Sequence, residues 1–234
     1  MEKYIFIFLR KGSKRLKNKS LQKIDKKSLF EITLKFAVKL KNINKVFVST
    51  DDERVKKIAS KYQCEIIDRP KKLALSSSPE ILSWKHAVNI VQKKYSKKFF
   101  FISLPITAPL RKKVDVYKCM REVVTKKKDI SISVTATNND PFFNMLIKKN
   151  KTILPIFSNN NKFNLRSNYK FFCTTTVCYV TTSYFVKKLK NLFSGRVSFV
   201  EVPFPRSIDI DTKNDLKIAR IFSRNWHIID NIKT

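Results

Sequence analysis

The 234-residue chain has only two glycines, two histidines and four cysteines, and these residues form no familiar metal or redox motif. The cysteines are Cys64, Cys119, Cys173 and Cys178; they contain no CxxC pair, and no histidine lies near them in sequence. This pattern argues against a zinc site and favours reduced, mostly buried thiols.

Long apolar runs are absent as well. No stretch of about 18 consecutive apolar residues occurs, so the sequence predicts no helix that spans a bilayer. The apolar part of the N-terminal segment MEKYIFIFLRK is too short for a signal peptide and is followed by cations. We therefore expect a cytoplasmic protein with no membrane partner.

Acidic residues are scarce, because 18 Asp and Glu stand against 50 Lys and Arg and leave a net charge of +32. Such an excess of positive charge is typical of nucleic-acid-binding proteins. The lysines are, however, scattered in pairs such as Lys56–Lys57 and Lys187–Lys188, and the wealth of Lys, Asn, Ile and Phe is typical of a strong A+T codon bias. We expect salt-sensitive attraction to polyanions in general, and no specific nucleic-acid partner.

What the chain does contain is a globular composition with 43% hydrophobic residues, in a pattern that alternates apolar runs with amphipathic stretches. The apolar runs predict strands at residues 3–9, 45–49, 65–67, 99–103, 130–135, 176–180 and 197–202. Helical spacing predicts helices at residues 28–41, 52–62, 80–95, 114–126, 183–192 and 213–222. Ser28 and Glu31 carry the signature of a capping box at the first of these helices. The alternation indicates one α/β domain over residues 1–234, a Rossmann-like three-layer sandwich with a mostly parallel central sheet.

Residues 136–170 break this rhythm, since they are polar, irregular and rich in asparagine. We expect them to form an excursion within the domain. In open parallel sheets, ligands bind beyond the carboxyl ends of the strands. That rule places residues 10–19, 49–52 and 103–111 on one rim of the sheet.

The basic segment LRKGSKRLKNKSL, residues 9–21, follows the first apolar run. Gly12 would let backbone N–H groups approach an anion, Ser13 adds a hydroxyl donor, and Arg10, Lys14 and Lys19 would neutralise charge. The segment is not a P-loop, because the GK[ST] triplet and its preceding glycine are missing. From these residues alone, a polyphosphate-binding loop and an ordinary solvated basic loop both stay open.

The segment SIDIDTKNDL, residues 207–216, places two carboxylates two positions apart. On an extended backbone, Asp209 and Asp211 face the same way while Ile208 and Ile210 anchor the opposite face. Two hard oxygen ligands presented together suit Mg²⁺ that is shared with substrate phosphates. The alternative is that Asp211 or Thr212 only caps the helix that follows.

Five segments in this order resemble the nucleotide-sugar cytidylyltransferases, specifically the CMP-N-acetylneuraminate (acylneuraminate) cytidylyltransferase family. They are LRKGSKRLKNKSL (9–21), VSTDDERV (48–55), DRPKKLA (68–74), ITAPLR (106–111) and SIDIDTKNDL (207–216). They look like the family's ARGGSKxxxxKN signature, its strand-and-turn motif, RPxxLA, TSPLR and the metal-binding IDID-TxxDL motif. The resemblance covers nearly the whole chain. It implies the nucleotide-diphospho-sugar transferase fold and an enzyme that joins CTP to an acidic 2-keto sugar, with Mg²⁺ as cofactor, giving the CMP-sugar and pyrophosphate.

The same resemblance implies roles for particular residues. The residues that would bind the nucleotide are Arg10, Gly12, Ser13, Lys19, Arg69 and Thr107. Asp209 and Asp211 would bind the metal, and Arg166 would contact the sugar. The catalytic residues would be Asp211, Arg10 and Lys19. Residues 136–170 would form a homodimer and lean over the neighbour's sugar site. Phe142, Phe143, Phe171 and Phe172 would then belong to the dimer core.

The chain departs from the family pattern at Lys17, Ser20, Ser76, Pro105 and Thr175–Thr176. Ser76 replaces an acid and Pro105 a glutamine that contacts the base, so these changes bear on base reading and sugar identity rather than on phosphate chemistry. Three alternatives accompany the main interpretation. They are a synthetase for CMP-Kdo, CMP-legionaminate or CMP-pseudaminate, a basic nucleic-acid-binding protein, and a non-catalytic relative of the enzymes.

Overall fold

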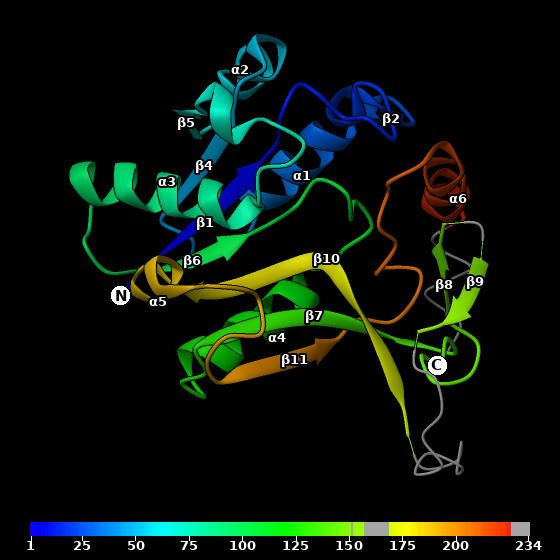
Figure 1. Cartoon of the computed structure of the whole chain (residues 1–234). Helices are drawn as coiled ribbons and strands as arrows, with labels where there is room; N and C mark the ends of the chain where they lie inside the picture. The colour runs from blue at the N-terminus through cyan, green and yellow to red at the C-terminus, as the bar shows by residue number, and fades with distance from the viewer. Residues whose placement is uncertain (151, 157–168, 226–234) are drawn as a thin grey trace.

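A seven-stranded sheet in the order β11-β7-β10-β6-β1-β4-β5 forms the centre of the protein (Figure 1). This computed structural model describes residues 1–150, 152–156 and 169–225. The strands of the sheet are β1 (Glu2–Phe8), β4 (Lys45–Thr50), β5 (Glu65–Asp68), β6 (Phe99–Ser103), β7 (Ile130–Thr137), β10 (Phe171–Thr182) and β11 (Val197–Glu201). Only β10 runs antiparallel to its neighbours, β6 and β7, and the other pairings are parallel. The prediction of a mostly parallel α/β sheet is confirmed.

Helices cover both faces of this sheet. The helices are α1 (Leu29–Val38), α2 (Glu53–Ala59), α3 (Glu80–Lys94), α4 (Lys113–Val124), α5 (Ser183–Lys188) and α6 (Lys213–Arg224). Short 3₁₀ turns lie at Lys19–Leu21 and Lys71–Leu73. Apart from end positions, these elements lie where the hydrophobic period places them, because each amphipathic stretch can bury its apolar stripe only against the sheet.

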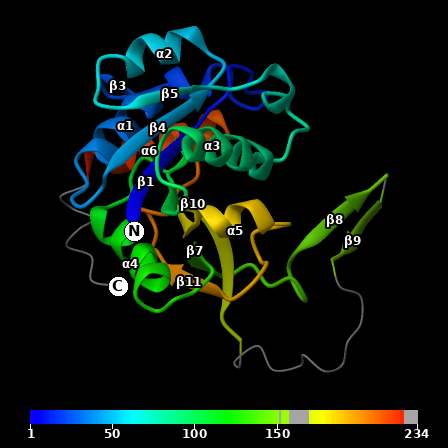
Figure 2. The same ribbon diagram turned by 90° about the vertical axis from the view of Figure 1, so that its left-hand side faces the viewer.

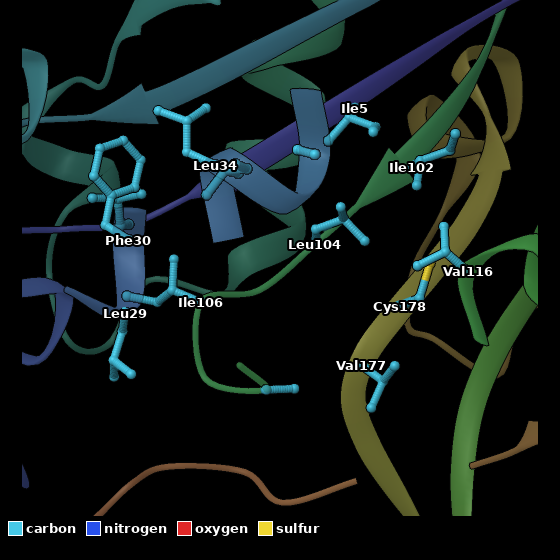
Figure 3. Close-up of a cluster of buried hydrophobic side chains, with 14 of the residues drawn as sticks. Ile5, Leu29, Phe30, Leu34, Ile102, Leu104, Ile106, Val116, Val177 and Cys178 are labelled. Carbon is cyan, nitrogen blue, oxygen red and sulfur yellow. The ribbon is translucent and has the colours of Figure 1, made fainter. Parts of the chain in front are cut away.

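The core divides into two clusters, one on each face of the sheet. Alternate residues of β1 separate, with Ile5 and Ile7 in one cluster and Tyr4, Phe6 and Phe8 in the other. The first cluster takes side chains from α1, α2, α4 and α6, and Figure 3 shows part of it, with side chains from α1 and α4 beside those from strands β1, β6 and β10. The second takes side chains from α3 and α5 and is rich in aromatic rings. This division confirms the predicted three-layer sandwich.

The capping box at the start of α1 is present as predicted. The Ser28 Oγ accepts from the backbone N–H of Glu31, and the Glu31 carboxylate accepts from the backbone N–H of Ser28 at 3.0 Å. The hydrogen bonds from Ser28 lower the pKa of Glu31. The serine therefore fixes the residue at which the helix begins.

The excursion at residues 136–170 is more regular than the sequence indicates. Strand β7 continues to Thr137, and β8 (Leu146–Lys149) pairs antiparallel with β9 (Thr152–Pro155). This hairpin projects away from the body of the protein (Figure 2). The prediction of an irregular segment is wrong here, because four-residue strands with the sequences LIKK and TILP show no apolar alternation with a period of two. A second small hairpin joins β2 (Lys23–Ile24) and β3 (Lys27–Ser28).

In the part of the chain that the structure describes, no helix combines the length and the apolar character that crossing a bilayer requires.

Candidate active site

A cleft of about 460 Å³ lies at the end of β1, on the rim that the sheet rule predicts. Its wall begins with Phe8, Leu9 and Arg10, where the strand ends, and continues on the segment after β6 with Ile106 and Thr107. The other lining residues are Ser13, Lys14, Arg15, Lys19, Ser20, Ser76 and Glu80. Residues far apart in sequence therefore converge on one basic cavity.

A smaller recess of about 240 Å³ adjoins this cleft and shares four of its residues, Phe8, Leu9, Arg10 and Glu80. Arg69 lines the recess together with Leu75 and Ser78. Arg69 is 9% exposed, its guanidinium donates to the Ser83 hydroxyl, and burial lowers its pKa. The two cavities together could hold a ligand with a phosphate part and a flatter, less charged part.

Hydrogen bonds tie the basic loop to the neighbouring strands. The backbone N–H of Leu9 donates to the Ser49 carbonyl at 3.1 Å, and that of Lys11 donates to the Asp51 carboxylate at 2.9 Å. Arg10 donates to the Ala74 carbonyl at 3.3 Å. The residues that the rim rule groups together therefore lie together.

Asp211 meets the basic loop directly. Its Oδ1 lies 2.5 Å from the Lys19 Nζ, and its Oδ2 lies 2.7 Å from a guanidinium nitrogen of Arg15. The Lys19 side chain is only 14% exposed, whereas that of Arg15 is 70% exposed. The acidic segment and the basic loop thus close on each other at the edge of the cleft.

Asp209 connects to the cleft through two threonines. The Thr176 hydroxyl donates to Asp209 Oδ1 at 3.0 Å and lies 2.8 Å from the hydroxyl of Thr107. The backbone N–H of Ile210 donates to the Thr107 carbonyl at 2.8 Å. Ile210 is fully buried while Asp209 is exposed, so the acidic segment alternates as the sequence predicts.

The alternative role of this segment as a helix cap belongs to Thr212. Its hydroxyl accepts from the backbone N–H of Asp215 at 3.2 Å, and the Asp215 carboxylate accepts from the backbone N–H groups of Asp211 and Thr212. Since Thr212 and Asp215 form the capping box of α6, the side chain of Asp211 is left for other contacts.

The oxygen donors of Asp209 and Asp211 fit a magnesium ion that is shared with a substrate. Among the described residues, no three His, Cys, Asp or Glu side chains form a group that could hold a metal by themselves. Mg²⁺ commonly takes one or two carboxylates, water and substrate phosphates, and does not need a full protein cage. The two aspartates beside a basic cleft meet that requirement.

Arg111, at the end of the segment ITAPLR, is a buried residue that contacts the loop lining the cleft. It is 5% exposed, its guanidinium donates to the Pro105 carbonyl, and burial lowers its pKa to about 10. Its guanidinium carbon lies 6.0 Å from the centre of the Phe36 ring. Arg111 thus holds the loop that carries Ile106 and Thr107.

The predicted site residues divide into three groups. In the first group, Arg10, Ser13, Lys19 and Thr107 line the cleft, and Arg69 lines the recess. Asp209 and Asp211 lie at the edge of the cleft. Gly12 is exposed beside the cleft, and nothing lies within 4 Å of the position that a Cβ would take. Arg166 lies outside the residues that the structure describes.

Sequence reasoning missed three residues of this site, Arg15, Glu80 and Thr176. Arg15 stands among other cations, and nothing in its position separates it from them. Glu80 begins α3, and the sequence does not distinguish it from an ordinary acid in the first turn of a helix. Thr176 was noted only as a departure from the family.

Comparison with known proteins agrees with this fold. Residues 5–78 match a family model described as cytidylyltransferase. The flagellin modification protein B of Campylobacter coli is 26% identical over 226 residues, which cover 95% of each chain. The N-acylneuraminate cytidylyltransferase of Escherichia coli O18:K1:H7 is 26% identical over 90% of this chain and 49% of its own length, and the CMP-N,N'-diacetyllegionaminic acid synthase of Campylobacter jejuni is 24% identical over 91% of both.

Among solved structures, a CMP:2-keto-3-deoxy-manno-octonic acid synthetase complexed with CTP has a similar fold, with a TM-score of 0.70 and 17% identity over 97% of this chain and all of the other. The fold is thus that of the nucleotidyltransferases. Over residues 5–78 the chain is similar to the cytidylyltransferases, and over most of its length it is CMP-sugar synthetase-like, which confirms the resemblance that its motifs carry.

Proposed function

We propose that the protein transfers the cytidylyl group of CTP to the anomeric hydroxyl of an acidic 2-keto sugar, giving a CMP-sugar for surface glycans and pyrophosphate. The observation that carries this proposal is the meeting of the basic cleft with the Asp209–Asp211 pair, through Lys19 on one side and Thr107–Thr176 on the other. A triphosphate needs such a cationic site, and a reacting phosphate needs the neighbouring carboxylates for its metal ion.

In this reaction the anomeric oxygen attacks the α-phosphorus in line. A bond forms between the two, and the bond to the bridging oxygen breaks as pyrophosphate leaves. Arg10, Ser13 and Lys19 bind and orient the phosphates, so catalysis rests on positioning and charge, without a nucleophilic side chain. Mg²⁺ bound at Asp209 and Asp211 would neutralise charge on the phosphate oxygens. We assign to Asp211 a second role, help in removing the hydroxyl proton.

We further propose that the working unit is a homodimer built on the excursion at residues 136–170. A two-stranded hairpin without other support is marginally stable in water. The β8–β9 hairpin nevertheless exposes apolar side chains, with Leu146 58%, Ile147 55% and Ile153 62% exposed. Phe143 and Phe172 nearby are 66% and 45% exposed. A second copy of the chain would cover them, and the sugar contact of Arg166 stays a prediction tied to that dimer.

The choice among acidic sugars stays open between sialic acid, legionaminate, pseudaminate and Kdo. The relatives include an N-acylneuraminate enzyme and a diacetyllegionaminic acid synthase at similar identities, 26% and 24%. We also keep the cytoplasm as the proposed compartment, because Cys64, Cys119, Cys173 and Cys178 are all free thiols.

The test is pyrophosphate release from CTP and Mg²⁺, with N-acetylneuraminate, Kdo, legionaminate and pseudaminate offered in parallel. Release with one sugar, and none without it, would establish the reaction and its acceptor together. If no sugar supports pyrophosphate release but CTP raises the melting temperature of the protein, the acceptor is another compound. No pyrophosphate release and no effect of CTP on the melting temperature would contradict the proposed function and favour a non-catalytic relative.

A further inference from the structure

Glu80 is the one carboxylate among the residues that line the cleft and its recess. It is the first residue of α3, four positions after Ser76, which lines the same cleft. Its Oε1 accepts a hydrogen bond from the indole N–H of Trp84 at 3.1 Å. Trp84 is 2% exposed, so a rigid core side chain holds the carboxyl group in place. The phosphate and metal chemistry described above gives this group no role.

Arg69 lines the same recess, and its guanidinium donates to the Ser83 hydroxyl while its Nε is enclosed by protein atoms. An arginine side chain has five N–H donors, more than these contacts use. Burial raises the pKa of the Glu80 carboxyl, while the Trp84 hydrogen bond and the positive charge of Arg69 oppose that rise and favour the ionised form. Phe8, Leu9 and Leu75 add apolar surface to the walls. The recess thus combines a donor, an acceptor and apolar walls, which is the combination that a flat heterocyclic base requires.

We propose that Glu80 determines the base specificity of the enzyme by accepting a hydrogen bond from the exocyclic amine of cytosine, while Arg69 donates to the acceptors on the same ring. Cytosine presents an N–H₂ donor at the position where uracil presents a carbonyl acceptor, and a carboxylate is a suitable partner for the cytosine amine. The same carboxylate repels the uracil carbonyl, so it selects for one base and against the other. The inference rests on the proposed use of a nucleoside triphosphate.

The departures from the family pattern agree with this assignment. Pro105 has no side-chain donor or acceptor, and its carbonyl already accepts from Arg111. Ser76 carries no charge. Glu80 therefore supplies, from the start of α3, a carboxylate for base reading that neither of those positions can provide.

The experiment measures binding of CTP, UTP and inorganic triphosphate by calorimetry, without sugar, to the wild-type protein, Glu80→Gln and Glu53→Gln. Glutamine keeps an acceptor for Trp84 and can donate to the uracil carbonyl. We expect Glu80→Gln to lower the ratio of CTP to UTP affinity by about 10- to 100-fold. Affinity for inorganic triphosphate should not change. Glu53→Gln makes the same chemical change on a side chain that is 81% exposed on α2, and should behave as the wild type.

Glu80→Asp provides a second variant, which keeps the charge but withdraws it from the base. It should lower the affinity for CTP without raising the affinity for UTP. An unchanged CTP-to-UTP ratio in Glu80→Gln, or a wild-type protein that binds both nucleotides equally, would overturn the role of Glu80 and leave the phosphate site intact. A wild-type protein that binds none of the three ligands would instead contradict the proposed function.

Discussion

Asp211 stands where the chain's basic loop and its acidic segment meet, and it is the residue whose replacement tests the site most directly. We expect Asp211→Asn to lower turnover by at least ~100-fold, because it removes a carboxylate that would hold the charge-neutralising metal ion. The assay is the rate of pyrophosphate release at saturating CTP and sugar.

Asp68→Asn is the matched control for that variant, since the Asp68 side chain is 83% exposed and lies on β5. Its turnover should match the wild type. Near-normal turnover in Asp211→Asn, with a normal melting curve, would remove the metal assignment.

Arg15 would compete with a metal ion for Asp211, because its guanidinium lies 2.7 Å from that carboxylate. We expect Arg15→Gln to raise the affinity for Mn²⁺ by about 2- to 5-fold in the absence of nucleotide, the scale of one exposed ion pair. Mn²⁺ titration followed by electron paramagnetic resonance measures it. An unchanged or weaker affinity would mean that the ion pair does not restrain the carboxylate.

At the scale of single elements, the cap of α1 is a clear contributor to stability. Ser28→Ala removes the hydroxyl that accepts from Glu31, and we expect a loss of about 1 kcal/mol. For a chain of this length, that loss lowers the melting temperature by about 2–4 °C. Ser77→Ala, at an exposed loop position, is the control in the same thermal melts. Equal melting temperatures for the two variants would contradict the importance of the cap.

The β8–β9 hairpin tests the proposed dimer. Ile147 and Leu154 lie opposite each other and are 55% and 42% exposed, so lysine at both positions should be tolerated in a monomer. If a second copy covers the hairpin, the double variant should convert the dimer to a monomer, because two charges would be buried in an apolar contact. Light scattering after gel filtration gives the mass. A wild-type protein that is already monomeric would refute the dimer.

At the scale of the whole molecule, ionised carboxylates stabilise a strongly basic chain. Hydrogen bonds from Arg196 hold the pKa of Asp129 low, and those from Arg54 do the same for Asp52. A carboxyl whose folded pKa is depressed stabilises the fold above its unfolded pKa, about 4, and this contribution is lost as the pH falls through the folded pKa.

We therefore expect the melting temperature to hold between pH 7 and 5 and to fall steeply below about pH 4. Protonation also raises the positive charge above its neutral-pH value of +32, which adds repulsion in the same direction. Calorimetric melts across this range measure the effect, and Asp129→Asn should show a shallower fall. A melting temperature that stays constant to pH 3 would refute the argument.

The sequence alone accounts for most of the elements, because helices and strands follow a local period. Residues 99–103 read as a strand covered on both faces, and Phe99–Ser103 is β6 in the structure. The order of motifs also indicated the rim of the sheet and most of the cleft residues. The β8–β9 hairpin was missed, because its two four-residue strands do not alternate and so cannot be distinguished from a loop by their period.

The tertiary structure alone decided which distant residues act together. Lys19 and Asp211 are 192 positions apart, and Thr176 is 33 positions from Asp209 and 69 from Thr107. Local periodicity carries no information about such pairs, since they depend on the order in which strands join the sheet. Glu80 shows the same limit: its sequence neighbourhood marks a helix start, and only the packing of α3 on β1 and β6 turns that carboxylate toward the cleft.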